Sequence, residues 1–361
     1  MRCNITWFCS LCCLLALAMA LPVAATAAVP VAVADVLTPG SVLVFPLFEK
    51  GTVANEIGTL PKTQFEISVQ CPKGVTCADN DVDIRAHWVC ANDQFCNESD
   101  FTLSTTVNGT VLFDPSGTCR PAAGFQNLEG CGSVSLPPPL FCDSGYLIAW
   151  VVDESGRAIK FDGLLGDAVL RETATAVTAY DAFSIQAGPT LANGAFTDVN
   201  GNGSLDFNGT EYKQVAGQII GSVRYDADSA TSDVDTSLIL LTLDVRSGLG
   251  NNPVAVGLNF YNEIEQLASE HTAFFCSTEQ RLSGLGLSSA FGEKGLVQST
   301  SASKTPLLGT GDRIGPVTLL GLVITREKGA VGTNLPAEST LRHYAYPLYN
   351  NNKGVVTAFV P

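Results

Sequence analysis

The segment Asp100–Asp114, "DFTLSTTVNGTVLFD", decides the fold class, because it places Asn108-Gly109 between two runs rich in β-branched and aromatic residues. Residues of those types are enriched in strands. Asn-Gly is the strongest short-range signal for a β-hairpin, since both central positions of its tight turn need φ > 0. The segment therefore predicts two adjacent antiparallel strands.

Strand signals recur along most of the chain. Gln64–Cys71 alternates polar and apolar residues, which is the period of a half-buried strand. Gly145–Phe161 repeats the strand–turn–strand arrangement around Glu154-Ser155-Gly156. Helical turns fit at two places, Asp162–Ala174 and Glu263–Phe275. Many short strands separated by turns predict an all-β fold, an antiparallel β-sandwich of Ig-like or jelly-roll type, or two such sandwiches packed together.

The N-terminus has the pattern of an export signal. A single positive charge at Arg2 precedes an apolar run from Ile5 to Val23, and small residues follow it. Cleavage is expected after Ala27, or as late as Ala34. The alternative is a membrane anchor, since the run is nearly long enough to span a bilayer. The alanine-rich exit favours cleavage, which predicts an extracellular or periplasmic protein with no membrane span after the signal is removed.

Cysteine usage agrees with an oxidising compartment. Four of the twelve cysteines lie in the expected signal peptide, which leaves an even number for disulfides. Seven of the remaining eight lie in the first half of the chain, so complete pairing requires that one of the seven bonds to the last. The eight candidates are Cys71, Cys77, Cys90, Cys96, Cys119, Cys131, Cys142 and Cys276.

Charge and cysteine distribution suggest the organisation of the chain. The net charge of −15 argues against nucleic acid as a partner and against anionic membrane surfaces, because both require a basic patch. An extracellular protein or glycan remains as the partner class. The expected parts are a cysteine-rich β-sandwich domain over 35–190, a candidate calcium loop over 191–212, and 213–361 as a second β-rich domain or a continuation of the first. The oligomeric state has no signature in the sequence.

Four blocks of the first half are similar to a loose group of secreted bacterial proteins. These blocks are Gly40–Phe48, His87–Cys90, Asp100–Asp114 and Gly145–Ala187. They cover somewhat less than half of the chain and contain no motif that carries chemistry. The resemblance implies an exported bacterial protein with Ig-like or jelly-roll strands, and it transfers no catalytic residue.

The stretch Asp198–Tyr212, "DVNGNGSLDFNGTEY", is the candidate metal site. An EF-hand-type loop supplies oxygen ligands from positions 1, 3, 5, 7 and 9 and has glycine at position 6. Counted from the first aspartate, Gly203 stands at position 6, and the ligand positions hold Asp198, Asn200, Asn202, the carbonyl of Ser204, and Asp206. The stretch resembles the calcium loops of dockerins and predicts a Ca²⁺ site.

One ligand departs from this pattern. Position 12 normally holds a bidentate carboxylate but is Gly209 here, and Glu211 is the candidate replacement. The alternative interpretation is a polar turn in which Asn and Gly simply tolerate left-handed backbone geometry.

Catalytic motifs are not found. The sequence has no Gly-x-Ser-x-Gly, His-Glu-x-x-His, P-loop or dinucleotide-binding pattern. His87, beside Trp88 in a predicted strand, is interpreted as a hydrogen-bonded structural histidine rather than a base. These observations predict a non-catalytic surface, adhesion or assembly protein. The alternative is a carbohydrate-binding module or a glycoside hydrolase on a jelly roll, because paired carboxylates leave no local signature.

Overall fold

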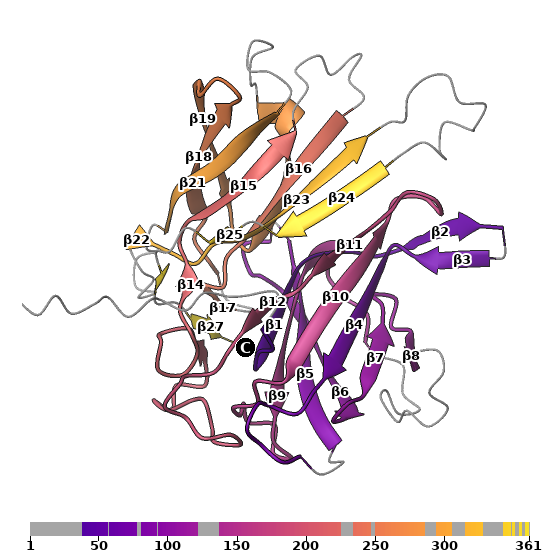
Figure 1. The fold of residues 1–361 in the computed structure, drawn as a ribbon, viewed down its shortest axis with the longest axis vertical. Helices are drawn as coiled ribbons and strands as arrows, with labels where there is room; N and C mark the ends of the chain where they lie inside the picture. The colour runs from indigo at the N-terminus through magenta and orange to yellow at the C-terminus, as the bar shows by residue number, and fades with distance from the viewer. Residues whose placement is uncertain are drawn as a thin grey trace, which may run out of the picture. The chain divides into compact units, whose positions relative to one another are not determined.

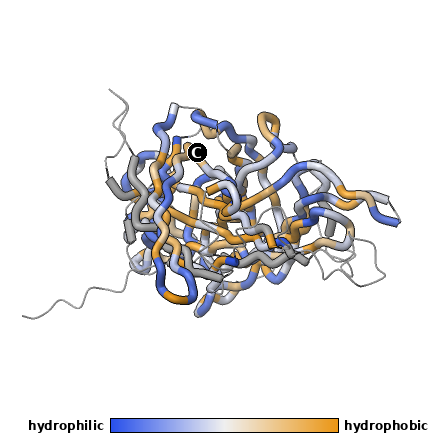
Figure 2. The backbone as a smooth tube through the Cα atoms, turned by 90° about the horizontal axis from the view of Figure 1, so that it is seen from above, coloured by the Kyte–Doolittle hydropathy of each residue, from blue (hydrophilic) through white to orange (hydrophobic). Residues whose placement is uncertain are grey.

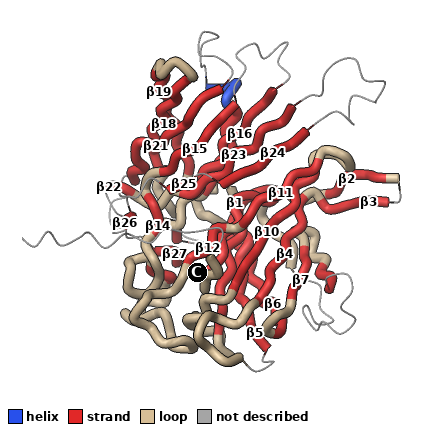
Figure 3. Tube along the Cα trace, viewed as in Figure 1, coloured by secondary structure: helices blue, strands red, loops and turns tan. Residues whose placement is uncertain are grey.

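Strands are the main regular structure in the described part of the computed structural model, and turns and loops connect them. The only helix in this part is the single 3₁₀ turn η1 (Leu282–Leu285) (Figure 3), so the all-β prediction is confirmed. The predicted signal peptide and Cys131 lie outside the described residues. These residues are 38–56, 58–77, 81–91, 93–121, 137–224, 234–246, 250–285, 294–304, 315–327, 342–347, 349–350, 354–355 and 358–360.

Two five-stranded antiparallel sheets form the first half of the chain (Figure 1). Sheet A has the order β12 (Phe183–Ile185), β1 (Val42–Glu49), β9 (Ser144–Val152), β5 (Asp81–Cys90) and β6 (Glu98–Thr106). Sheet B has the order β11 (Val177–Asp181), β10 (Leu164–Arg171), β4 (Thr63–Val69), β7 (Thr110–Phe113) and β8 (Cys119–Pro121). A separate hairpin is formed by β2 (Thr52–Asn55) and β3 (Gly58–Pro61).

Alternation along the strands builds a core that the two sheets share. On β5 the even-numbered residues from Val82 to Trp88 are buried in it, and on β4 the odd-numbered residues Phe65 and Ile67 meet them. The rings of Phe65 and Trp88 lie with centroids 5.5 Å apart. Burying such large apolar side chains is the main stabilising contribution to this part of the fold. In Figure 2, stretches of the backbone coloured orange for hydrophobic residues cross the middle of the molecule.

The Asn108-Gly109 turn is not a hairpin, and this corrects the expectation from the sequence. Its two flanking strands form as predicted, but β6 pairs with β5 in sheet A whereas β7 pairs with β4 in sheet B. Asn108 has φ 67°, and a Cβ on Gly109 would lie 2.4 Å from the hydroxyl oxygen of Thr105. The turn therefore carries the chain from one sheet to the other, and glycine is required there for close approach.

The second half of the chain forms two further sheets. Sheet C contains β19 (Leu267–Phe274), β18 (Val254–Asn262), β21 (Lys294–Lys304), β15 (Ile219–Arg224) and β25 (Tyr349–Asn350), with β22 (Gly315–Pro316) paired to β21. Sheet D contains β20 (Ser277–Arg281), β16 (Val234–Leu241), β23 (Leu320–Glu327) and β24 (Arg342–Pro347). Their apolar side chains, such as Leu240, Leu258 and Phe260, share a second core.

Both segments where helical turns fitted the sequence are strands. Asp162–Ala174 contains β10, which is hydrogen-bonded to β4 on one side and β11 on the other. Glu263–Phe275 contains the β18–β19 turn and then β19. Pairing with neighbouring strands has overridden the weak local preference for helix.

The outer face of sheet A is covered by short pairings from the second half. In this layer β27 (Ala358–Val360) lies between two short strands. It pairs antiparallel with β13 (Leu205–Asp206) and parallel with β17 (Val245–Arg246). Phe359 of β27 lies 5.9 Å, between ring centroids, from His87 on sheet A. A further short pair joins β14 (Val215–Ala216) to β26 (Gly354–Val355). The Asp198 loop leads directly into β13, so this covering layer positions the candidate metal site.

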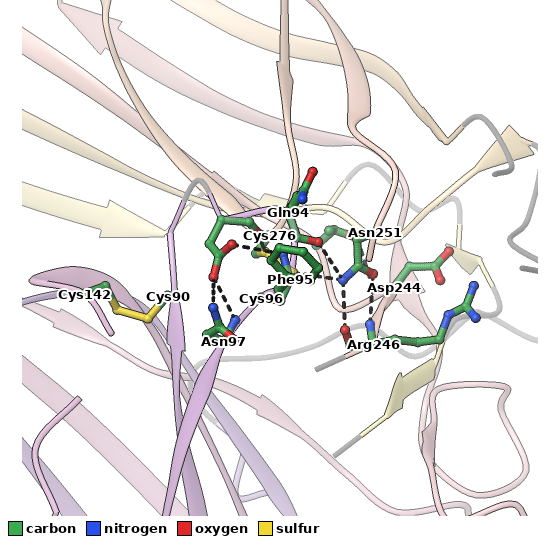
Figure 4. The surroundings of a disulfide bond; sticks show 12 residues. Cys90, Gln94, Phe95, Cys96, Asn97, Cys142, Asp244, Arg246, Asn251 and Cys276 are labelled. Carbon is green, nitrogen blue, oxygen red and sulfur yellow. Dashed lines mark hydrogen bonds between the residues drawn. A yellow bond between two sulfur atoms is a disulfide. The ribbon is translucent and has the colours of Figure 1, made fainter. Parts of the chain in front are cut away.

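Three disulfides staple the described chain. They join Cys71 to Cys77, Cys90 to Cys142, and Cys96 to Cys276. The last confirms that one cysteine of the first half reaches Cys276. Beside it, Asn251 fixes the junction by donating from Nδ2 to the carbonyl of Arg246 at 2.8 Å and from its backbone amide to the carbonyl of Gln94 at 2.8 Å (Figure 4).

Candidate functional site

The Asp198 loop is organised by one carboxylate. Asp198 Oδ1 accepts the backbone amides of Gly201 at 2.8 Å and Asn202 at 3.1 Å, and its Oδ2 accepts the amide of Gly203 at 3.0 Å. Gly201 and Gly203 have φ of 72° and 76°, which is the left-handed region that favours glycine. The glycines let the chain curl around the side chain at its first position.

The polar side chains that follow Asp198 converge on Asp206. Asn200 Nδ2 and Asn202 Nδ2 donate to Asp206 Oδ2 at 2.7 Å and 3.0 Å. The amide oxygen of Asn202 accepts the backbone amide of Ser204 at 2.8 Å. The structure thus brings together the side chains at positions 1, 3, 5 and 9 of the predicted loop. The apolar residue between them, Leu205, is buried against sheet A.

Glu211 closes the loop from its exit. Its Oε1 accepts the backbone amides of Val199 at 2.9 Å and Asn200 at 3.1 Å. The residue is only 1 % exposed, and its second oxygen, Oε2, is buried without a hydrogen-bond partner in the described part of the chain. A buried carboxylate oxygen without a partner is costly, and a bound cation is one group that would offset this cost.

The surroundings of Glu211 disfavour the charged form of its carboxyl group. Burial raises the pKa of its carboxyl above the ordinary value, and the charges of Asp206 and Asp198 raise it further. The hydrogen bonds from the backbone amides of Asn200 and Val199 act in the opposite direction. Three carboxylates on one short loop thus repel one another, and within the described chain their hydrogen-bond donors are amide groups rather than cationic side chains.

The residue set fits a calcium ion. Calcium binds six to eight oxygens from carboxylates, amide carbonyls, backbone carbonyls and water. The chain offers Asp198, Asn200, Asn202, the carbonyl of Ser204, Asp206 and the free oxygen of Glu211. Each Asn side chain presents nitrogen to Asp206 and oxygen to a backbone amide, that of Asn202 for Asn200 and that of Ser204 for Asn202. To bind an ion through oxygen, either side chain would have to turn its amide and give up that second hydrogen bond.

A second cluster of potential metal ligands lies on the outer face of sheet A. His87 on β5, and Glu98 and Asp100 on β6, bring one ligand atom each within 4.8 Å of one another. His87 is fully buried, and its Nδ1 lies 2.8 Å from Glu98 Oε2 and 3.4 Å from Asp100 Oδ1. No local sequence pattern indicates this grouping, because it depends on which residues of two strands lie opposite each other.

The hydrogen bonds of this cluster indicate a structural role. Arg85 Nε donates to His87 Nε2 at 3.1 Å, so the proton of a neutral imidazole is on Nδ1 and is donated to Glu98. A metal ion on Nδ1 would displace that proton and turn Nε2 into a donor facing Arg85. Arg85 also pairs with Asp100 at 3.2 Å. His87 is thus buried and hydrogen-bonded, as the sequence led us to expect.

Comparison with known proteins adds no assignment. The chain matches no protein-family model, and no curated protein is significantly similar to it. Among the described residues there is no helix long and apolar enough to cross a membrane. The loop, the disulfides and the strands are therefore the basis of the functional proposal.

Proposed function

We propose that this protein is a secreted, non-catalytic extracellular or cell-surface protein, a surface, adhesion or assembly component, with a structural Ca²⁺ in the loop Asp198–Glu211. Disulfides persist in oxidising compartments, which supports export. Paired β-sheets stapled by three disulfides suit a rigid extracellular body. The calcium ion would neutralise part of the loop's charge and tie Asp198, Asp206 and Glu211 together.

The observation that carries the calcium assignment is the buried Oε2 of Glu211, which has no hydrogen-bond partner within the described chain and belongs to the same loop as the side-chain oxygens of Asp198, Asn200, Asn202 and Asp206. A polar turn without metal explains the Asn and Gly residues but not a buried carboxylate that faces two further carboxylates. Affinity is expected in the range of extracellular modules, about 10⁻⁴ to 10⁻³ M, because the loop has few carboxylates.

Isothermal titration of the purified protein with CaCl₂ tests this assignment. One ion per chain should bind, and MgCl₂ should bind much more weakly because magnesium demands tighter octahedral geometry. Asp206→Asn keeps the shape of the side chain and should abolish the binding, whereas Asp143→Asn, outside the loop, should leave it unchanged. Equal calcium binding by wild type and Asp206→Asn would refute the site.

The alternative, a carbohydrate-binding module or a glycoside hydrolase, is favoured by one observation. A pocket beside the loop is lined by Trp150 and Phe196. Aromatic side chains are common in ligand pockets, so this feature fits a binding module.

A further inference from the structure

A pocket of about 390 Å³ lies between the Asp198 loop and the outer face of sheet A. This volume falls within the roughly 300–1,000 Å³ typical of small-molecule sites. The pocket brings two guanidinium groups together in a chain whose net charge is −15. Its lining includes Arg85, Trp150, Arg157 and Phe196 on one part, and Asp198 and Ser204 of the loop on another, so one acidic side chain also lines it.

Arg157 is held in place before any ligand arrives. Its Nε and Nη2 donate to Asp153 Oδ2 at 3.1 Å and 2.9 Å, and its guanidinium carbon lies 3.7 Å from the ring centroid of Phe196. These contacts occupy one edge of the guanidinium group and place it over one face of the Phe196 ring. Nη1 makes no hydrogen bond within the described chain, so it remains as a donor on a side chain that is 61 % exposed.

Arg85, which also lines the pocket, is held in the same manner. Its Nε donates to His87 Nε2 and its Nη2 to Asp100 Oδ2, at 3.1 Å and 3.2 Å. Its Nη1 likewise has no hydrogen bond to the residues that the structure describes. The buried imidazole thus acts as a support that orients a pocket residue. A guanidinium N–H is the kind of donor that binds a carboxylate oxygen, and both of these side chains line the same pocket.

We propose that this pocket binds the carboxylate group of a small ligand between Arg85 and Arg157, and that calcium in the neighbouring loop strengthens the binding. The calcium part rests on the proposed function. The loop residues Asp198, Asp206 and Glu211 carry up to three negative charges that repel an anion, and a bound calcium ion offsets two of them. Acidic sugars and acidic amino acids both supply the required carboxylate.

Calorimetric titration separates these sources. The probes are sodium glucuronate and N-acetylglutamate, with glucose as the neutral match to the first. The buffer contains 5 mM CaCl₂, about five times the weaker limit of the expected calcium affinity, so most calcium sites would be filled. Parallel titrations use resin-treated calcium-free buffer, because soluble chelators themselves carry carboxylates. At least one acid should bind about tenfold more tightly than glucose, and about threefold more tightly with calcium than without it.

Variants localise the binding. Arg157→Gln should weaken the acid about tenfold, whereas Lys73→Gln, which removes the same charge from an exposed position outside the pocket, should not. Glucose binding as tightly as both acids, or unchanged binding by Arg157→Gln, would overturn the inference. A separate titration with calcium alone distinguishes the two proposals. Calcium binding without selective acid binding refutes only the pocket. Arg157-dependent acid binding without calcium binding refutes the calcium site and the strengthening by calcium, and leaves the carboxylate pocket standing.

Discussion

The carboxylate of Glu211 accepts the backbone amide of Asn200 at 3.1 Å, so the exit of the Asp198 loop is tied back to its entrance. This contact places a buried acid beside the side chains of Asp198 and Asp206. The loop is therefore closed by an acid whose second oxygen has no partner in the described chain. This oxygen of Glu211 is the reason for proposing a calcium ion in the loop.

Glu211→Gln should change stability in opposite directions with and without calcium. Burial and neighbouring carboxylates raise the pKa of Glu211, which means that the folded protein disfavours the charged form. The neutral isostere should therefore melt at a higher temperature than wild type in calcium-free buffer. In buffer with calcium, the variant should not show the rise in melting temperature that calcium gives the wild type. Differential scanning calorimetry in both buffers measures this, and an equal shift in both would contradict it.

The long-range disulfide should contribute more stability than the local one. Cys96 and Cys276 are 180 residues apart, whereas Cys71 and Cys77 are 6 apart. The chain-entropy model gives about 5 kcal/mol for the longer loop and about 2 kcal/mol for the shorter. Replacing each pair by alanine and comparing urea unfolding tests the difference. Equal losses from the two double variants would show that loop length does not set the effect.

The two remaining cysteines should form a fourth bond. With three pairs assigned, Cys119 and Cys131 are left of the eight outside the expected signal peptide. An exported protein with an even number of cysteines is expected to pair them all. Peptide mapping by mass spectrometry without reduction should recover a fragment that links these two residues. Detection of two free thiols would contradict full pairing.

Asp167 should make the fold less stable as pH rises. It lies on β10 directly between Glu66 of β4 and Asp181 of β11, and burial together with these two charges raises its pKa from 3.8 to about 6. The folded state therefore binds more protons than the unfolded state between about pH 4 and 6, so stability falls as pH rises through that window. Asp167→Asn should be more stable than wild type at pH 7, by about 1 kcal/mol after allowance for solvent screening.

Asp153 provides a control of opposite sign. A hydrogen bond from the side chain of Ser155, followed by one from the backbone of Arg157, lowers its pKa to about 2. The stability that this carboxylate contributes is fully present above its pKa in the unfolded chain. It is lost as pH falls through its pKa in the folded protein. Asp153→Asn should therefore be less stable than wild type at pH 7, and the difference should vanish toward pH 2. Unfolding curves of both variants from pH 2 to 8 measure the two trends.

Local patterns predicted the strands but not their partners. The runs on either side of Asn108-Gly109 are strands, yet β6 and β7 belong to different sheets. The turn signal reports backbone conformation at Asn108, whereas sheet membership depends on contacts with β5 and β4, which are distant in sequence. β10 was ambiguous with a helix for the same reason, because its neighbours decide its conformation.

The candidate site shows the same division. Asp198, Asn200, Asn202 and Asp206 lie within nine consecutive residues, so spacing alone was sufficient to group them. The contacts of His87 with Glu98 and Asp100, and of Arg85 with both strands, depend on the register between β5 and β6. No local motif encodes a register, and the pocket beside the loop was therefore not predictable from the sequence.

The most direct test of the calcium proposal is the melting temperature of the mature protein in calcium-free buffer and in millimolar CaCl₂, with MgCl₂ as the control. A ligand that binds only the folded state raises its stability by mass action. The calcium proposal predicts an upward shift with calcium that is absent with magnesium and absent in Asp206→Asn. An identical melting temperature in all three buffers would show that Asp198–Glu211 is a polar turn without a metal.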